Sequence, residues 1–249
     1  MNYIKTAIVP SAAALLCACA QIPEGAGENP SDPYEVINRR VYEFNRVVDE
    51  GVMKPVAQGY KKITPDFIEK RVSNASSNLV EPSHSVNSLL QGKADNAIES
   101  GFRFLVNSTF GIFGMFDVAG EIGLNKHEES FGNTLASWGV GQGSYIVLPI
   151  LGPTTTRDVW SYPVMWAADP TSYVFRDEPW WSYWSVTGLR AVDLRAKLLQ
   201  FEGIRESTID EYVAVREAYL QRRRKDTQTV EATEEEELET LTPLNFDEE

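Results

Sequence analysis

Residues 102–124 have the sequence FRFLVNSTFGIFGMFDVAGEIGL, and the interpretation of the whole chain depends on them. The thirteen residues between Arg103 and Asp117 carry no charge. A helix that crosses a bilayer needs about 20 apolar residues, so this stretch is too short to cross one. Gly111 and Gly114 follow a polar Asn-Ser-Thr sequence within it. This composition favours a helix that breaks and turns back.

The apolar side chains of this stretch allow two environments. They could form a helix-turn in the core of a soluble domain, or a hairpin that dips partway into a bilayer. The residues expected to form the membrane hairpin are Phe104, Leu105, Phe110, Ile112, Phe113 and Phe116. The remaining sequence has to distinguish the two.

The negative charge of the chain is concentrated at its C-terminal end. The 249 residues have a formal net charge of −13, and residues 226–249 contain ten acidic and no basic side chains. The body is therefore only mildly acidic and offers no electrostatic footprint for nucleic acid. We expect residues 226–249 to form a disordered, solvating tail, or alternatively to contact a basic partner.

The N-terminal residues have the pattern of a bacterial lipoprotein signal. An apolar run from Ala7 to Leu16 ends in Leu16-Cys17-Ala18-Cys19, in which Cys19 fits the lipobox. We expect residues 1–18 to be removed, Cys19 to be lipidated, and residues 19–31 to form a flexible tether. Ala20 after the cysteine favours the outer membrane. The alternative is an ordinary cleaved signal peptide with incidental cysteines.

Hydrophobic periodicity predicts a mostly helical, all-α body at residues 32–225. Asp32 and Pro33 are expected to cap the first helix, and Glu81-Pro82 to end the third. Helices are predicted at residues 34–49, 55–65, 66–81, 83–91, 95–110, 131–138, 154–166, 180–201 and 210–225, with an extended segment at 145–149.

Gly139, Gly141 and Gly143 form a Gly-x-Gly-x-Gly sequence that invites comparison with phosphate-binding loops. A dinucleotide fingerprint follows a strand and opens a helix, whereas these glycines follow a helical pattern and precede an extended one. We therefore expect them to supply left-handed backbone conformations or hinge freedom.

No constellation of residues indicates catalysis, a metal site or a cofactor. His84 and His127 lack a nearby nucleophile pattern and an obvious orienting acid, so we expect no enzyme activity. A carboxylate pair assembled by the fold remains possible. Seven aromatic residues between Trp166 and Trp184 could form a packed core or lie at a membrane interface.

Five ordered segments of the chain resemble the MlaA (VacJ) family of outer-membrane lipoproteins. They span nearly the whole body: DPYEVINRRVYEFN (32–45), SNLVEPSHSVNSLLQG (77–92), FRFLVNSTFGIFGMFDVAG (102–120), FGNTLASWGVGQGSYIVLPILGPTTTRD (131–158) and DEYVAVREAYLQRR (210–223).

The resemblance implies a ring of amphipathic helices lying in the inner leaflet of the outer membrane, lipid-anchored at the periplasmic face. A central channel would let mislocalised phospholipid leave the outer leaflet toward a periplasmic carrier similar to MlaC, beside a trimeric porin. Gly139 and Gly141 match the hinge loop of the family, and Phe44 matches its first helix near the channel. Glu43 stands where the family commonly has an uncharged residue.

The leading hypothesis is therefore passive phospholipid transport that maintains outer-membrane lipid asymmetry. One alternative is a porin-associated structural lipoprotein without transport activity. A second alternative is an envelope hydrolase, which the missing nucleophile disfavours.

Overall fold

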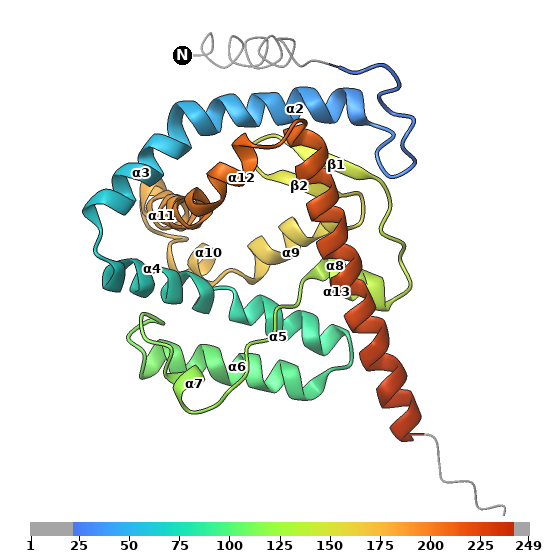
Figure 1. Cartoon of the computed structure of the whole chain (residues 1–249). Helices are drawn as coiled ribbons and strands as arrows, with labels where there is room; N and C mark the ends of the chain where they lie inside the picture. Colours follow the sequence, from blue (N-terminus) through green and yellow to red (C-terminus); the bar gives the residue numbers. More distant parts are fainter. Residues whose placement is uncertain (1–21, 242–249) are drawn as a thin grey trace, which may run out of the picture.

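The computed structural model describes the backbone of residues 22–241, and the side chains of that range other than those of residues 204, 206 and 228–241. Helices form a ring-like frame (Figure 1). Helices α2 (Glu35–Val48) and α3 (Lys54–Ile63) form one side, α4 (Asp66–Asn78) and α5 (Glu81–Leu90) form the opposite side, and α13 (Glu211–Leu241) closes one end. The predicted signal peptide and Cys19 lie outside the described residues.

The first side of the frame is nearly continuous helix. It comprises α2 (Glu35–Val48), the π-helical turn η1 (Asp49–Met53) and α3 (Lys54–Ile63). Asp32 does not cap α2 through its side chain as predicted. Its carboxylate is fully buried and accepts hydrogen bonds from Asn38, Tyr212 and Arg216, which tie the start of the body to α13. The described end of the expected tether forms turns, and Ser31 O accepts a hydrogen bond from Tyr145 N.

The opposite side consists of α4 (Asp66–Asn78), α5 (Glu81–Leu90) and α6 (Ala94–Thr109). The prediction that Pro82 ends the preceding helix is wrong, because Pro82 lies in the first turn of α5. Proline is tolerated there since the first N–H groups of a helix have no intrahelical partner. Gly92 follows α5 with a φ of 80°, as expected for a helix stop.

The middle of the chain contains short elements. They are α7 (Val118–Glu121), α8 (Phe131–Ser137) and the antiparallel strands β1 (Tyr145–Leu148) and β2 (Gly152–Thr155). Tyr145 pairs with Thr155, and Leu148 pairs with Gly152. The helix predicted at 154–166 therefore begins later, because Thr154 and Thr155 complete the hairpin.

Two asparagines on α2 hold strand β1 against the helix. Asn38 donates to Tyr145 O at 3.0 Å and accepts from Val147 N at 2.9 Å. Asn45, two turns later, donates to Leu148 O at 2.9 Å and accepts from Ile150 N at 2.7 Å. Asn38 thus satisfies backbone groups on the free edge of β1, and Asn45 satisfies one at the end of the strand and one in the turn that follows it.

The C-terminal half is again helical. It comprises η2 (Asp158–Trp160), α9 (Ser161–Ala168), α10 (Pro170–Val174), α11 (Trp180–Leu198), η3 (Leu199–Phe201), α12 (Glu202–Glu206) and α13 (Glu211–Leu241). Helix α13 continues past the predicted boundary at Lys225, so residues 226–241 are helical where we expected disorder. Glutamate, which is frequent there, is a good helix former. Residues 242–249 lie outside the described part.

The apolar core is small, and polar side chains occupy much of the interior. Val41, Tyr145, Val147, Tyr212 and Leu220 form the core cluster between α2, β1 and α13. Among the described residues, more polar and charged side chains than hydrophobic ones are buried, while large apolar side chains are exposed on nearly every helix. Water-soluble proteins show the opposite preference.

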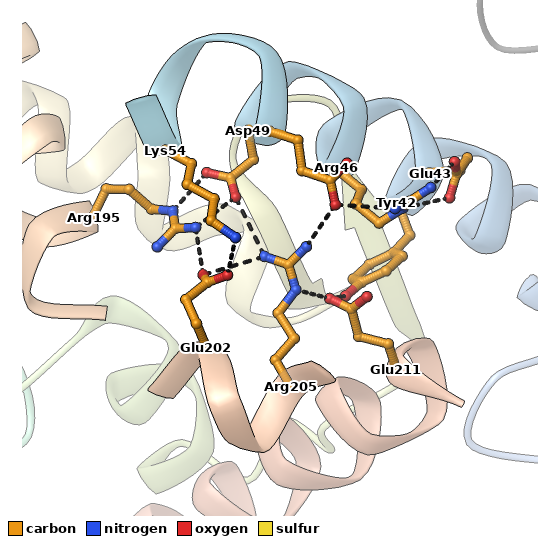
Figure 2. Close-up of polar contacts among 10 residues, drawn as sticks. Tyr42, Glu43, Arg46, Asp49, Lys54, Arg195, Glu202, Arg205 and Glu211 are labelled. Carbon is orange, nitrogen blue, oxygen red and sulfur yellow. Dashed lines mark hydrogen bonds and ion pairs between the residues drawn. The ribbon is translucent and has the colours of Figure 1, made fainter. Parts of the chain in front are cut away.

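An ionic network joins α2 and η1 to the C-terminal helices (Figure 2). Arg195 contacts Asp49 through two bonds of 2.6 and 2.8 Å and also binds Glu202 at 2.6 Å. Arg205 reaches Asp49, Glu50, Glu202 and Glu211, and Tyr42 donates to Glu211. The network links segments about 150 residues apart in sequence and so helps to close the frame.

This network predicts a loss of stability in acid. Burial raises the pKa of Asp49 and of Glu202, but hydrogen bonds and charges from Arg195, Arg205 and Lys54 lower both below their ordinary values of 3.8 and 4.5. Their stabilising contribution is therefore complete above those values and is lost as the pH falls through the lower folded-state pKa values. Urea unfolding from pH 7 to pH 3 should show stability falling below about pH 5. Arg195→Met should flatten that dependence; an unchanged slope would contradict the assignment.

The close packing around Gly132 leads to a second prediction about stability. A Cβ at this position of α8 would lie 2.3 Å from Asp158 Oδ1 and 2.9 Å from Arg223 Nη2. Gly132→Ala should therefore lower the free energy of unfolding by about 1–3 kcal/mol, as overpacking of an interior does. Gly188→Ala is the matched control, since its Cβ would meet nothing within 4 Å. In that helical position alanine should stabilise by up to about 1 kcal/mol. Thermal unfolding of both variants measures the difference.

Candidate functional site

The chain reverses direction after α6 in a hairpin tip that we define as residues 110–116. Ile112 and Phe113 have φ values of 52° and 55°, and Gly114 follows at 85°. Left-handed backbone is uncommon for non-glycine residues, and for a β-branched or bulky one it is a genuine outlier. Such strain persists where the surroundings hold it in place and is found at functional sites.

The side chains of the hairpin tip point away from the protein. Phe113 is 82% exposed and Phe110 is 76% exposed, and Ile112 and Phe116 are also exposed. On α6, Leu105 is exposed and Phe104 is half-buried. The alternative of a helix-turn sealed in a soluble core is therefore wrong. The predicted break and reversal of the helix is confirmed.

A buried polar cluster fixes the base of the hairpin. Arg103 Nε donates to Glu81 Oε1 at 3.1 Å, its Nη2 donates to Asp117 Oδ1 at 3.0 Å, and its Nη1 donates to Leu124 O at 2.7 Å. Asn107 donates to the same Asp117 oxygen and accepts from Ala119 N. One guanidinium thus joins α5, α6 and the segment that returns from the tip.

Close packing explains both glycines of the tip, against backbone groups at Gly111 and against the Asn78 side chain at Gly114. A Cβ at Gly111 would lie 2.2 Å from Phe116 O, and one at Gly114 would lie 2.5 Å from the Cβ of Asn78. Arg71 of α4 lies over the Phe116 ring at 4.0 Å. The tip therefore has a tightly packed inner side and an apolar outer side.

Exposed apolar side chains extend well beyond the hairpin tip. No helix within residues 22–241 is both long and apolar enough to cross a bilayer. The aromatic region does not form a packed core, since Trp166, Tyr173, Trp180, Trp181 and Trp184 are all exposed. Other exposed apolar residues on α2, α3, α4 and α5 include Ile37, Val47, Val56, Ile63, Phe67 and Leu89. Exposed apolar surface on this scale is typical of proteins that contact a membrane or protein partners.

The three loop glycines differ in whether, and why, the local structure requires glycine. Gly139 has a φ of 81° and ends α8, while Gly143 has a φ of 69° and leaves no room for a Cβ beside Thr156 Oγ1. The expectation of left-handed backbone is confirmed at both positions. Gly141 has neither feature, and a Cβ there would meet open space.

This loop contributes to the lining of two adjacent pockets. The first has a volume of about 380 Å³ and is largely apolar. The second, of about 300 Å³, is more polar. Val140, Gly141 and Arg157 line both pockets. The first pocket adds Phe131, Leu135, Thr156 and Trp160, and the second adds Ala136, Gly139, Gln142, Arg224 and Thr227.

Arg157 is held in place by the buried carboxylate of Asp158. Arg157 Nε donates to Asp158 Oδ1 at 3.0 Å, and Arg223 of α13 binds both oxygens of that carboxylate. Burial raises the pKa of Asp158, but the hydrogen bonds and charges of Arg223 and Arg157 outweigh it and lower the pKa. No sequence pattern indicates this group, because Arg157 and Asp158, at the start of η2, meet Arg223 of α13 only in the folded chain.

Phe44 and the histidines lie outside these pockets. Phe44 is half-buried on α2 and lines neither pocket. Glu99 Oε2 lies 2.7 Å from His127 Nε2, an acid partner that the sequence analysis missed, and His84 contacts Glu129 O. Among the side chains that the structure describes, no three from His, Cys, Asp or Glu gather as metal ligands would.

Comparison with known proteins identifies the family. The family model described as MlaA lipoprotein matches residues 30–226. An uncharacterized protein of Rickettsia bellii is 38% identical over 200 residues, covering 79% of this chain and 77% of that protein. The intermembrane phospholipid transport system lipoprotein MlaA of Escherichia coli is 36% identical over 219 residues, covering 84% and 82%.

A solved structure has the same fold. It comes from work on the structural basis for maintenance of bacterial outer membrane lipid asymmetry, and it superposes with a TM-score of 0.69 at 33% identity. The superposition covers 79% of this chain and 99% of that one. The mostly helical architecture predicted from the sequence is confirmed by this match and by the helices themselves. The chain belongs to the MlaA lipoprotein family.

Proposed function

We propose that this protein is an outer-membrane lipoprotein that removes mislocalised phospholipid from the outer leaflet and so maintains lipid asymmetry. Phospholipid would pass through an amphipathic channel to a soluble periplasmic carrier similar to MlaC. The relatives named as intermembrane phospholipid transport lipoproteins support this role. Cys19 would carry the acyl chains that anchor the protein at the periplasmic face.

One observation carries the proposal: the apolar hairpin tip is exposed and strained while polar groups fill the interior. A lipid pathway needs polar surface for headgroups and apolar surface for acyl chains. Amphipathic helices set about 5–10 Å into the headgroup boundary provide both without spanning the bilayer. The hairpin tip would then be immersed in acyl chains, with backbone N–H groups of the tip bonded to carbonyls of α6 and of the tip itself.

Site-specific photocrosslinking tests this placement. A photoreactive residue introduced in turn along 104–116 and 139–143 should capture phospholipid at Phe110 and Phe113. Purified protein should also carry phospholipid, and cells lacking the protein should accumulate phospholipid in the outer leaflet. A normal outer leaflet in those cells, together with lipid-free purified protein, would refute the proposal.

A porin-associated structural role is the second candidate, because the exposed apolar surface could equally face protein. The glycine loop separates the two. Gly139→Pro also disturbs the end of α8, whereas a Cβ at Gly141 would meet nothing within 4 Å, so Gly141→Val tests hinge freedom with less disturbance of the packing. If the loop moves during transport, Gly141→Val should raise outer-leaflet phospholipid while a trimeric porin still co-purifies. If the protein has only a structural role, Gly141→Val should change neither the outer-leaflet phospholipid nor the co-purification of the porin.

A further inference from the structure

We infer that the pocket pair beside the glycine loop binds the phosphate group of an acyl lipid, with Arg157 and Gln142 as its polar ligands. This inference rests on the proposed function only in assigning the phosphate to a lipid. It names a headgroup site where the proposed function specifies only a pathway.

Arg157 carries the inference, because it is buried yet incompletely paired. Only 4% of the residue is exposed. Its Nε binds Asp158 and its Nη1 lies 3.4 Å from Val140 O, whereas its Nη2 is buried with no hydrogen-bond partner in the described part of the chain. Leaving such a donor unpaired is costly, so an unpaired one indicates a missing ligand.

Gln142 adds a second unpaired donor on the same side. Its Nε2 is also buried without a hydrogen-bond partner among the described residues, and it lines the second pocket together with Arg157 and Arg224. No acidic side chain lines either pocket. A pair of arginines with an amide donor suits an anion with several acceptor oxygens, such as a phosphate.

The first pocket explains why the phosphate would belong to a lipid. Arg157 forms a shared wall, and beyond it Phe131, Leu135 and Trp160 line an apolar space. A phosphate held by Arg157 would therefore be next to both the apolar first pocket and the more polar second pocket. The volumes of about 380 and 300 Å³ suit a headgroup and the start of an acyl chain.

Calorimetric titration of the full-length lipoprotein in a non-ionic detergent tests the site. Three probes are compared: short-chain phosphatidylglycerol, the matching diacylglycerol that lacks the phosphate, and inorganic phosphate. Phosphatidylglycerol should bind at least about tenfold more tightly than either of the others, since only it has both a phosphate group and acyl chains. Equal binding of the diacylglycerol would overturn the inference. Equal binding of inorganic phosphate would overturn its assignment to a lipid.

Two substitutions that change the charge of the second pocket test whether the lipid binds there, and each has a control outside the pockets. Gln142→Glu places a carboxylate in the lining of the second pocket, where it should repel phosphate, so phosphatidylglycerol affinity should fall about tenfold or more. Gln58→Glu makes the same change at an exposed position of α3 and should have no effect. Arg224→Gln should weaken binding, unlike Arg222→Gln, which changes a side chain outside both pockets.

The results that would refute this binding site differ from those that would refute the proposed function. Unchanged lipid affinity in both pocket variants would refute the site even if cells carrying them transported phospholipid normally. Weakened affinity would support the site even if outer-leaflet phospholipid proved independent of the protein. Thermal unfolding should show that Gln142→Glu remains folded, because the replaced Nε2 makes no hydrogen bond in the described structure.

Discussion

Replacing Ile112 and Phe113 together by asparagine is expected to leave the protein at least as stable while lowering its affinity for phospholipid vesicles about tenfold or more. Both residues have left-handed backbone, which costs roughly 1–2 kcal/mol at a residue other than glycine and is least unfavourable for asparagine and aspartate. Their exposed side chains have few protein contacts to lose. Stability and membrane affinity should therefore change independently.

The expected loss of affinity follows from apolar area. Fully burying a large apolar side chain contributes about 1.5–3 kcal/mol, so even partial immersion of two such side chains exceeds tenfold in binding. Flotation with phospholipid vesicles measures the effect. The Cys19→Ser background removes the proposed acyl anchor, which would otherwise dominate binding.

The matched control is Ile112→Val with Phe113→Leu. These changes keep apolar side chains and keep the backbone strain, so vesicle binding should be largely retained and stability should not rise. If the asparagine variant floats with vesicles as well as the control does, the hairpin tip is not the membrane-contacting element.

Much of this hairpin could be predicted from sequence, but its geometry could not. The length of the uncharged run excluded a spanning helix, and the two glycines indicated the reversal. The left-handed residues were not foreseen, because sequence patterns place positive φ at glycine. Here Gly111 is needed instead for close approach to Phe116 O, and Ile112 and Phe113 take the unusual conformation.

Polar clusters were the least predictable feature of the chain. Asp49 meets Arg195, and Asp32 meets Arg216, across separations of 146 and 184 residues. Hydrophobic periodicity reports which face of a helix is apolar, but it does not report which charged side chains meet. The pocket ligand Arg157 was missed for the same reason. Strand β2 was missed because Gly-Pro-Thr-Thr shows no alternation and forms only by pairing with β1.

Arg103→Met should be among the most destabilising single substitutions in the protein, at about 3–5 kcal/mol. Glu81 is only 1% exposed, and its Oε2 has no hydrogen-bond partner within the described residues, so the carboxylate depends on Arg103. Removing the guanidinium leaves a buried charge without compensation. It also releases Asp117 and Leu124 O, which define the base of the hairpin. Urea unfolding in detergent measures the loss.

A second substitution distinguishes charge burial from lost packing. In Arg103→Met/Glu81→Met both charges are absent, so at least half of the lost stability should return, since replacing a buried ion pair by apolar residues is often nearly neutral. Arg71→Met is the control for removing a nearby cation. It deletes only the contact over the Phe116 ring and should cost about 0.5–1 kcal/mol. A double variant as unstable as Arg103→Met would show that the hairpin depends on the hydrogen bonds to Asp117 and Leu124 and not on compensation of Glu81.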